Sequence, residues 1–289
     1  MNTSFAIVTG ANSGLGFETA RRLAALSPEV RIVLACRNPR RGAEAERSIR
    51  ESTGNSHVRA YALDLASLAS VRAFAADVTG ETDDPIDALV CNAGISRGDG
   101  PTVDGLDPVF ETNHLGHFLL TRLLLPHLSS TARIISVSSD MHRPPGPRMT
   151  WPGADDVAGL GRRPPTRRLR YSYSKLCNLY FTYELTRRLE TDHSGVTTAA
   201  FNPGLMTDTN FATMPAAAGA VLRRVFSSRV GDLETSSSAL ARLAAGATRV
   251  PIGGRYFDRT DAVSTPSSAL SYDVDNARDL WEVSSRLAG

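Results

Sequence analysis

Lys175 is the only lysine of the chain, and the other 31 of its 32 strong bases are arginines. It follows Tyr171 by four residues, and residues four apart on a helix share one face. A phenol has a pKa near 10, and an ammonium about 5 Å away favours its phenolate by roughly 3 kcal/mol, about two pH units. We therefore expect Tyr171 to be an acid–base group whose pKa Lys175 lowers.

A glycine-rich turn with the spacing G-x-x-x-G-x-G follows the first apolar run of the sequence. In an open α/β sheet, the first turn between strand and helix offers backbone N–H groups and a helix N-terminus to a pyrophosphate. Gly10 permits the tight turn, Gly14 lets the backbone approach the phosphates, and Gly16 lets the helix pack on the strand. The segment predicts a dinucleotide site that includes Gly10, Asn12, Ser13, Gly14, Leu15 and Gly16.

The end of the second predicted strand indicates which dinucleotide binds. An acidic residue there favours a free ribose 2′-hydroxyl, whereas a basic residue accommodates a 2′-phosphate. This chain has Arg37 at that point and no acidic residue, with Arg40 and Arg41 close behind. We therefore predict NADP(H) as the cofactor, with Arg37 facing the 2′-phosphate.

Two further strand ends carry candidate cofactor contacts. Asp64 and Leu65 close the third predicted strand, where the Asp64 carboxylate can accept a hydrogen bond from the adenine amine. Alternatively, Asp64 is the N-cap of the next helix. Asn92, Ala93 and Gly94 close the fourth strand, where the asparagine can tie strand ends together and the small residues leave room for the cofactor ribose.

The elements that must position these residues follow from the apolar pattern. Short runs rich in Val, Ile, Leu and Ala predict strands at 5–9, 31–36, 58–63, 88–91, 133–137 and 197–201. Helical spacing of apolar residues predicts helices at 15–26, 41–51, 68–78, 113–128 and 176–189. The alternation predicts an α/β Rossmann fold with one domain over 1–289, built on a doubly wound parallel sheet of about seven strands with helices on both faces.

Two segments are candidates for the substrate site. Prolines break the pattern over 140–170, which is either a solvated surface loop or an insertion facing the substrate. The stretch 205–230 is apolar with few charges, as a lid over a hydrophobic ligand would be, or alternatively a contact between subunits. A last strand signal at 255–257 could pair subunits at a sheet edge, so a homo-oligomer is left open.

Composition excludes several classes of protein. A net charge of +2 with interspersed signs offers no footprint for nucleic acid. No stretch approaches the roughly 20 apolar residues of a membrane span. The three cysteines lie in apolar runs, which indicates a reducing, cytoplasmic location without disulfides. The histidines have no acidic partners at metal-ligand spacing, so we expect no metal.

Taken together, these motifs make the chain resemble the short-chain dehydrogenase/reductase family over essentially its whole length. The matching residues are 9–16, Asn92-Ala93-Gly94, Asn113, Ser138-Ser139, Tyr171 with Lys175, and Asn202-Pro203-Gly204. The resemblance implies that Ser139 orients the substrate oxygen, with Ser138 as the alternative. It also implies that Asn113 holds a water next to the lysine and that Pro203 and Gly204 border the nicotinamide.

Within that family, two branches are similar to different parts of the chain. The segments 35–38 and 112–118 resemble retinol-dehydrogenase-like enzymes, which mostly use NADPH. The segments 63–68, 174–178 and 276–284 resemble light-dependent protochlorophyllide reductase, in which the cysteine matching Cys177 lies at the pigment site. Cys177 is two residues past Lys175, about 200° around a helix, so we expect it in the core.

These observations predict an NADPH-dependent oxidoreductase that transfers hydride to the carbonyl of a hydrophobic, aromatic or polycyclic substrate, or oxidises the alcohol in reverse. Its predicted catalytic set is Asn113, Ser139, Tyr171 and Lys175. Two alternatives stay open. One is reduction of a conjugated C=C bond, as the pigment reductase suggests. The other is a repurposed scaffold that binds a ligand or catalyses a non-redox reaction.

Overall fold

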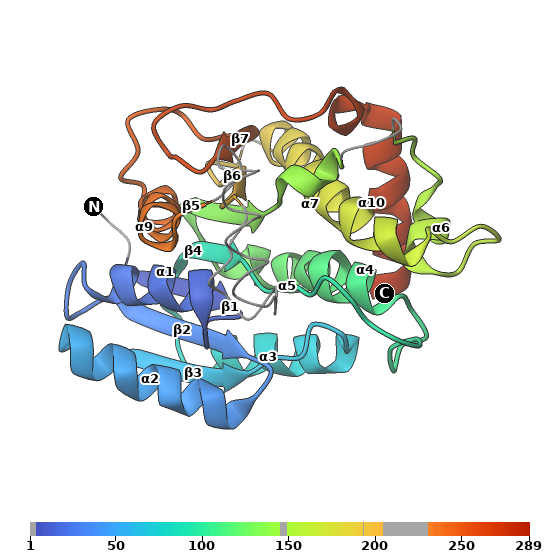
Figure 1. Ribbon diagram of the computed structural model, residues 1–289. Helices are drawn as coiled ribbons and strands as arrows, with labels where there is room; N and C mark the ends of the chain where they lie inside the picture. The colour runs from blue at the N-terminus through green and yellow to red at the C-terminus, as the bar shows by residue number, and fades with distance from the viewer. Residues whose placement is uncertain (1–3, 145–148, 193, 205–230) are drawn as a thin grey trace, which may run out of the picture.

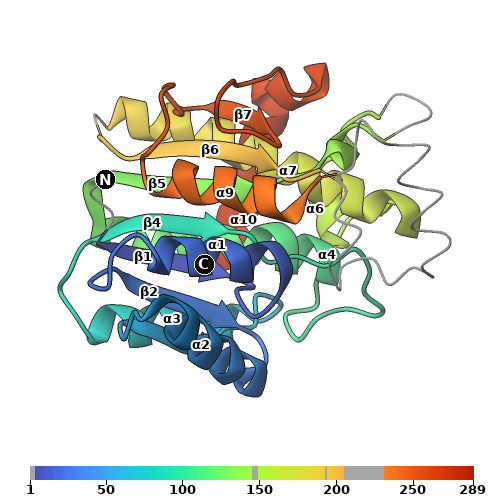
Figure 2. The same cartoon turned by 60° about the vertical axis from the view of Figure 1, so that its left-hand side comes forward.

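A parallel β-sheet forms the centre of the protein. The computed structural model describes residues 4–144, 149–192, 194–204 and 231–289. Its seven strands are β1 (Phe5–Thr9), β2 (Arg31–Cys36), β3 (Val58–Ala62), β4 (Ile86–Cys91), β5 (Leu128–Val137), β6 (Thr197–Asn202) and β7 (Arg255–Asp258). They are ordered β3-β2-β1-β4-β5-β6-β7, and every neighbouring pair is parallel. The strand order reverses between β1 and β4, where ligands of doubly wound sheets bind at the carboxyl ends (Figure 2).

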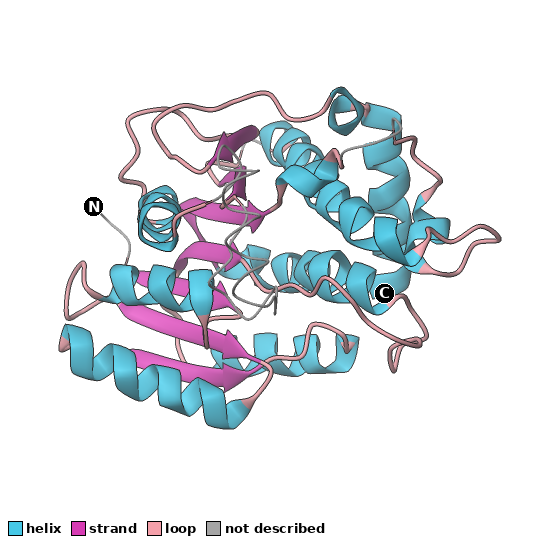
Figure 3. Cartoon of the chain, viewed as in Figure 1, coloured by secondary structure: helices cyan, strands magenta, loops and turns pink. Residues whose placement is uncertain are grey.

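Helices cover both faces of this sheet, as the apolar pattern predicts (Figures 1 and 3). One face carries α1 (Gly14–Ala24), α2 (Pro39–Thr53) and α9 (Leu233–Ala244). The other carries α3 (Leu68–Gly80), α5 (Gly116–Leu124), α7 (Arg167–Thr191) and α10 (Val274–Ala288). Because strand β1 and the carboxyl-terminal parts of β4 and β5 are buried on both faces, they are nearly continuous apolar runs rather than alternating ones.

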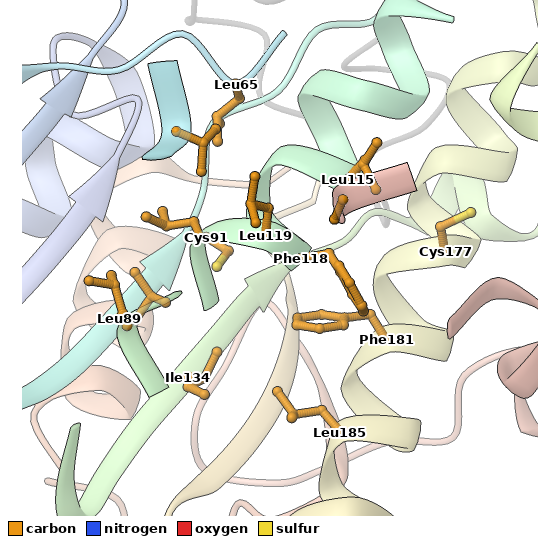
Figure 4. Packing of buried hydrophobic residues seen from close by; sticks show 14 of the residues in the cluster. Leu65, Leu89, Cys91, Leu115, Phe118, Leu119, Ile134, Cys177, Phe181 and Leu185 are labelled. Atoms are coloured by element: carbon orange, nitrogen blue, oxygen red, sulfur yellow. The ribbon is translucent and has the colours of Figure 1, made fainter. Parts of the chain in front are cut away.

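The larger core lies between the sheet and α5, α7 and α10 (Figure 4). Leu89 and Ile134 of the sheet face this layer, and the rings of Phe118 and Phe181 meet edge to face with centroids 5.8 Å apart. Cys177 is fully buried here, as expected from its place on α7. Burial raises the pKa of its thiol, so the group is a small apolar side chain rather than a nucleophile.

The helix predicted at 113–128 differs from the observed element at both ends. It begins earlier, as α4 (Pro108–Phe110), because Asp107 caps it by accepting from the N–H groups of Val109 and Phe110 at 3.0 Å each. It then passes through a π-helical stretch, η1 (Glu111–Leu115), before α5. It ends in the short helix η2 (Leu125–His127), where Pro126 lacks the N–H that a longer helix needs.

The segment 149–170 is tied to the C-terminal helix. It holds α6 (Ala154–Ala158) and the start of α7, and it follows the short helix η3 (Asp140–His142). Asp279 of α10 accepts from Trp151 Nε1 at 2.7 Å and from the Ala154 N–H at 2.9 Å. This part of the predicted insertion is therefore packed against α10 rather than forming a purely solvated loop. The predicted lid at 205–230 lies outside the described residues.

Strand β7 is an edge strand, as the signal at 255–257 suggests. Its outer side is partly occupied, because Phe257 forms an antiparallel bridge with Ser264 and the Thr265 N–H donates to the Tyr256 carbonyl at 2.9 Å. The chain thus covers part of this edge itself.

Candidate active site

Tyr171 and Lys175 lie one turn apart on α7. Lys175 Nζ is 5.6 Å from the centre of the Tyr171 ring, and the lysine is 3% exposed. Its ammonium donates to the carbonyl of Val137, the last residue of β5, at 2.9 Å. Asn178 Nδ2 donates to the same carbonyl at 3.0 Å. The carboxyl end of β5 therefore holds the lysine beside the tyrosine.

The prediction that Lys175 lowers the pKa of Tyr171 is wrong. Burial raises the pKa of Tyr171 to about 12, and a hydrogen bond with Ser139 opposes this only in part. Burial also lowers the pKa of Lys175 to about 8. The ammonium lies over the ring and bonds to a main-chain carbonyl, so the loss of water around the phenol outweighs the attraction of the charge.

The two serines after β5 have different surroundings. Ser138 is 1% exposed, and its hydroxyl donates to the Lys175 carbonyl at 2.9 Å, which anchors α7. Ser139 is partly exposed, hydrogen bonds to Tyr171 and accepts the Met141 N–H at 3.2 Å as the cap of η3. Of the two hydroxyls, that of Ser139 is next to the tyrosine, as an oxygen-orienting group must be.

Asn113 lies in the π-helical stretch and is fully buried. Its Oδ1 accepts the Ile95 N–H at 2.7 Å, and its Nδ2 donates to the Ile95 carbonyl and to Ser174 Oγ at 2.9 Å each. A Cβ placed on Gly94 would lie 3.1 Å from Asn113 Oδ1 and 3.6 Å from Lys175 Nζ. Both polar atoms therefore border the same small space beside Gly94.

The glycine turn fits a pyrophosphate. Gly10 and Gly14 have φ of +65° and +55°, which disfavours other residues. A Cβ on Gly16 would lie 2.4 Å from Asn92 Nδ2 and 2.6 Å from the Gly10 carbonyl oxygen. Ser13 caps α1 without a side-chain bond, and the first turn has no acidic residue, so its N–H groups are available to an anion. Asn12 and Ser13 are partly or fully exposed there, whereas Leu15 is buried.

The residues that follow β2 and β3 were predicted to contact the cofactor, and their surroundings differ. Arg37, Arg40 and Arg41 are exposed, and no described carboxylate forms an ion pair with them. Asp64 is not the N-cap of α3; that residue is Ser67, which accepts the Ser70 N–H at 3.3 Å. Asp64 Oδ1 instead accepts the Ala66 N–H at 3.0 Å.

The remaining predicted contacts line the carboxyl edge of the sheet. The Leu65 side chain lies in the core, so only its main chain can face a cofactor (Figure 4). Asn92 Nδ2 donates to the Thr9 carbonyl at 2.8 Å and ties β4 to β1, with Ala93 and Gly94 following. After β6, Gly204 has a φ of +80° and follows the buried Pro203.

Two histidines that were not among the predicted site residues also contact this site. His117 Nδ1 lies 3.1 Å from the Asn113 carbonyl, and His142 Nδ1 lies 2.6 Å from the Ser139 carbonyl. Their spacing of four and three residues from predicted site residues is the signal that could have identified them. Among the described residues, no group of three or more His, Cys, Asp or Glu side chains is arranged to hold a metal ion.

Comparison with known proteins agrees with this fold and site. Residues 4–154 match the model of the family described as short chain dehydrogenase. Human retinol dehydrogenase 13 is 38% identical over 293 residues, covering 98% of this chain and 84% of that protein. Human retinol dehydrogenase 12 is 36% identical over 286 residues, with 98% and 85% covered.

A solved structure is similar over nearly the same extent. It is described as a putative uncharacterized protein from Mycobacterium paratuberculosis, with a TM-score of 0.68, 32% identity, and 99% of this chain and 93% of that chain covered. The chain belongs to the short-chain dehydrogenase/reductase family, in its retinol-dehydrogenase-like branch. It is therefore an oxidoreductase of a family that uses nicotinamide cofactors. In the described part of the chain, no helix has both the length and the apolar content for crossing a bilayer.

Proposed function

We propose that this protein is an NADPH-dependent reductase of carbonyl groups on hydrophobic, aromatic or polycyclic substrates. The observation that carries the proposal is the gathering of Tyr171, Ser139 and Lys175 at the carboxyl end of β5. A phenol with a pKa of about 12 keeps its proton at neutral pH, which suits an acid that gives a proton to a carbonyl oxygen.

The roles of the side chains follow from their surroundings. The glycine turn would hold NADPH, which would supply the hydride for the carbonyl carbon. Tyr171 donates its hydroxyl proton to the carbonyl oxygen, and the Ser139 hydroxyl holds that oxygen in place. The Lys175 ammonium stabilises the phenolate that Tyr171 becomes. The space shared by Asn113 Oδ1 and Lys175 Nζ suits a water that returns the proton.

Preference for NADPH is supported by the surface at the end of β2. Three guanidinium groups lie at this strand end, those of Arg37, Arg40 and Arg41, and no described carboxylate pairs with them. A 2′-phosphate would give them an anionic partner. An acid that would bind a free 2′-hydroxyl is missing at this strand end. The dinucleotide would lie with its pyrophosphate on the N-terminus of α1.

The test is to follow NADPH consumption with a panel of aromatic and polycyclic ketones and with retinal, which has a carbonyl conjugated to C=C bonds. The proposal expects an alcohol product with the C=C bonds intact, and a Tyr171→Phe variant with activity lowered by a factor on the order of 10³. A product with the C=C bond saturated would instead establish the alternative reaction. Full turnover by Tyr171→Phe would overturn Tyr171 as the acid, whereas no NADPH consumption with any of these substrates would favour the repurposed scaffold.

A further inference from the structure

A buried series of hydrogen bonds begins at Thr9, the residue before the glycine turn. Its hydroxyl oxygen accepts the N–H groups of Asn92 and Ala93, both at 2.9 Å. With both lone pairs occupied, the hydroxyl hydrogen has two acceptors within reach. They are His117 Nε2 at 2.9 Å and the Val90 carbonyl at 3.3 Å. The shorter contact assigns Nε2 of His117 as the acceptor.

This assignment fixes the other side of the ring. A neutral imidazole that accepts at Nε2 carries its hydrogen on Nδ1, and that nitrogen lies 3.1 Å from the Asn113 carbonyl. His117 is 3% exposed, and burial lowers its pKa to about 4, so the ring is neutral at physiological pH. The Asn113 carbonyl belongs to the π-helical stretch, where main-chain bonds run from i to i+5.

The bonds continue from Asn113 to the catalytic helix. Asn113 Nδ2 donates to Ser174 Oγ at 2.9 Å, and that hydroxyl donates to the Tyr171 carbonyl at 2.8 Å. The first of these contacts is buried and the second is partly buried, so water has little access to replace Ser174 as the partner of Asn113. These hydrogen bonds therefore join the end of β1, which precedes the glycine turn, to the residue that carries the proton. The series runs through Thr9, His117, Asn113, Ser174 and Tyr171.

We propose that His117 is a positioning residue, which uses both ring nitrogens to fix the π-helical Asn113 between the end of β1 and the catalytic helix. This inference rests on the proposed function only in taking Tyr171 as the acid. His117 itself touches neither the tyrosine hydroxyl nor the turn that would hold the dinucleotide. It acts through Asn113, whose side chain bonds to both Ile95 and Ser174.

Two amide variants separate the ring's two bonds. His117→Asn places an N–H near the position of Nδ1 and keeps a donor for the Asn113 carbonyl, whereas His117→Gln places its amide near Nε2 and keeps a partner for Thr9. We expect His117→Asn to retain kcat within about threefold of the parent and His117→Gln to lose about tenfold, with little change in KM for NADPH in either. Equal losses in both variants would reduce His117 to a structural residue and overturn the proposal.

His114→Gln is the matched control. His114 is buried on the same π-helical stretch, but its Nε2 lies 2.8 Å from Ser284 Oγ of α10, away from the series of bonds. It is expected to change stability and to leave kcat within about twofold of the parent. A loss of kcat in His114→Gln as large as that in His117→Gln would contradict a specific role for His117.

A second measurement needs neither substrate nor a variant. NMR of the imidazole nitrogens in the unaltered protein at neutral pH is expected to show His117 as the Nδ1–H tautomer, with Nε2 unprotonated. An Nε2–H tautomer or a protonated ring would overturn the assigned bonds. Because this readout is independent of turnover, it separates failure of this inference from failure of carbonyl reduction by the protein.

Discussion

Lys175 lies over the face of the Tyr171 ring, with Nζ 5.6 Å from the ring centre, and donates to the Val137 carbonyl rather than to the tyrosine. The only lysine of the chain is thus held by the end of β5. Burial lowers the pKa of this lysine to about 8 and raises that of Tyr171 to about 12, so within the neutral range the phenol is protonated and the lysine is near its titration point.

This pair predicts the pH dependence of reduction. Because the Lys175 pKa is lowered, the ammonium is present below about pH 8 and is lost as pH rises through that value. Tyr171 keeps its proton over the same range. We expect kcat for carbonyl reduction to be level below about pH 8 and to fall up to tenfold per pH unit above it. Rates measured from pH 6 to 10 check this, and a level profile to pH 10 would contradict it.

The surroundings of the two neighbouring serines predict that one alanine substitution lowers mainly kcat and the other mainly stability. Ser139→Ala removes the hydroxyl beside Tyr171 and is expected to lower kcat by about a hundredfold, as loss of an oxygen-stabilising donor does elsewhere. Ser138→Ala removes a buried bond to the Lys175 carbonyl and is expected to lower the free energy of unfolding by about 1 kcal/mol, with a smaller loss of kcat. Rates and urea unfolding of both variants decide between the two roles.

Arg37 predicts the choice of dinucleotide. Removing one charge-assisted bond to a phosphate costs about 1.5–3 kcal/mol, so Arg37→Ala is expected to weaken NADPH binding roughly tenfold to a hundredfold and to leave NADH binding unchanged. Fluorescence titration with each dinucleotide measures both constants. Arg47→Ala is the control, since Arg47 is exposed in the middle of α2. Equal weakening by both variants would point to general electrostatics instead.

Glu111 predicts a pH-dependent stability. Burial raises the pKa of this carboxyl from 4.5 to about 7, with the Asp104 carboxylate adding to the shift. Stability from the neutral form is fully present below about pH 4.5 and is lost as pH rises through 7, at a cost on the order of 3 kcal/mol. Glu111→Gln is therefore expected to raise the free energy of unfolding at pH 8 more than at pH 5.

Glu184→Gln is the control for that comparison. Glu184 is also buried, but its carboxylate pairs with Arg187 and Arg188 at 2.7 and 2.8 Å. Its replacement is expected to destabilise the protein at both pH values, because it removes one partner of a buried ion pair. Urea unfolding of the parent and both variants at pH 5 and pH 8 supplies the comparison. Stabilisation of both variants at pH 8 would show that carboxylate burial in general, and not Glu111 in particular, is costly.

The amino-acid sequence by itself determined the class of fold and named most residues of the candidate site. Strands at 5–9 and 31–36 are observed with the predicted bounds, because buried parallel strands are continuous apolar runs that end in turn residues. The glycine turn and the pair Tyr171 and Lys175 are local patterns, set by the backbone conformations that glycine allows and by the period of a helix.

Only the tertiary structure decided what depends on contacts between distant segments. The pKa of Tyr171 is set by burial among elements far apart in the chain, which outweighs the nearby ammonium. The roles of Ser138 and Ser139 are separated by what each hydroxyl contacts on α7, which is the Lys175 carbonyl for Ser138 and Tyr171 for Ser139. His117 has its role because packing brings Thr9, the last residue of the inner strand β1, against the helix that carries Asn113. Sequence spacing cannot report such distances, since they are set by how the layers pack.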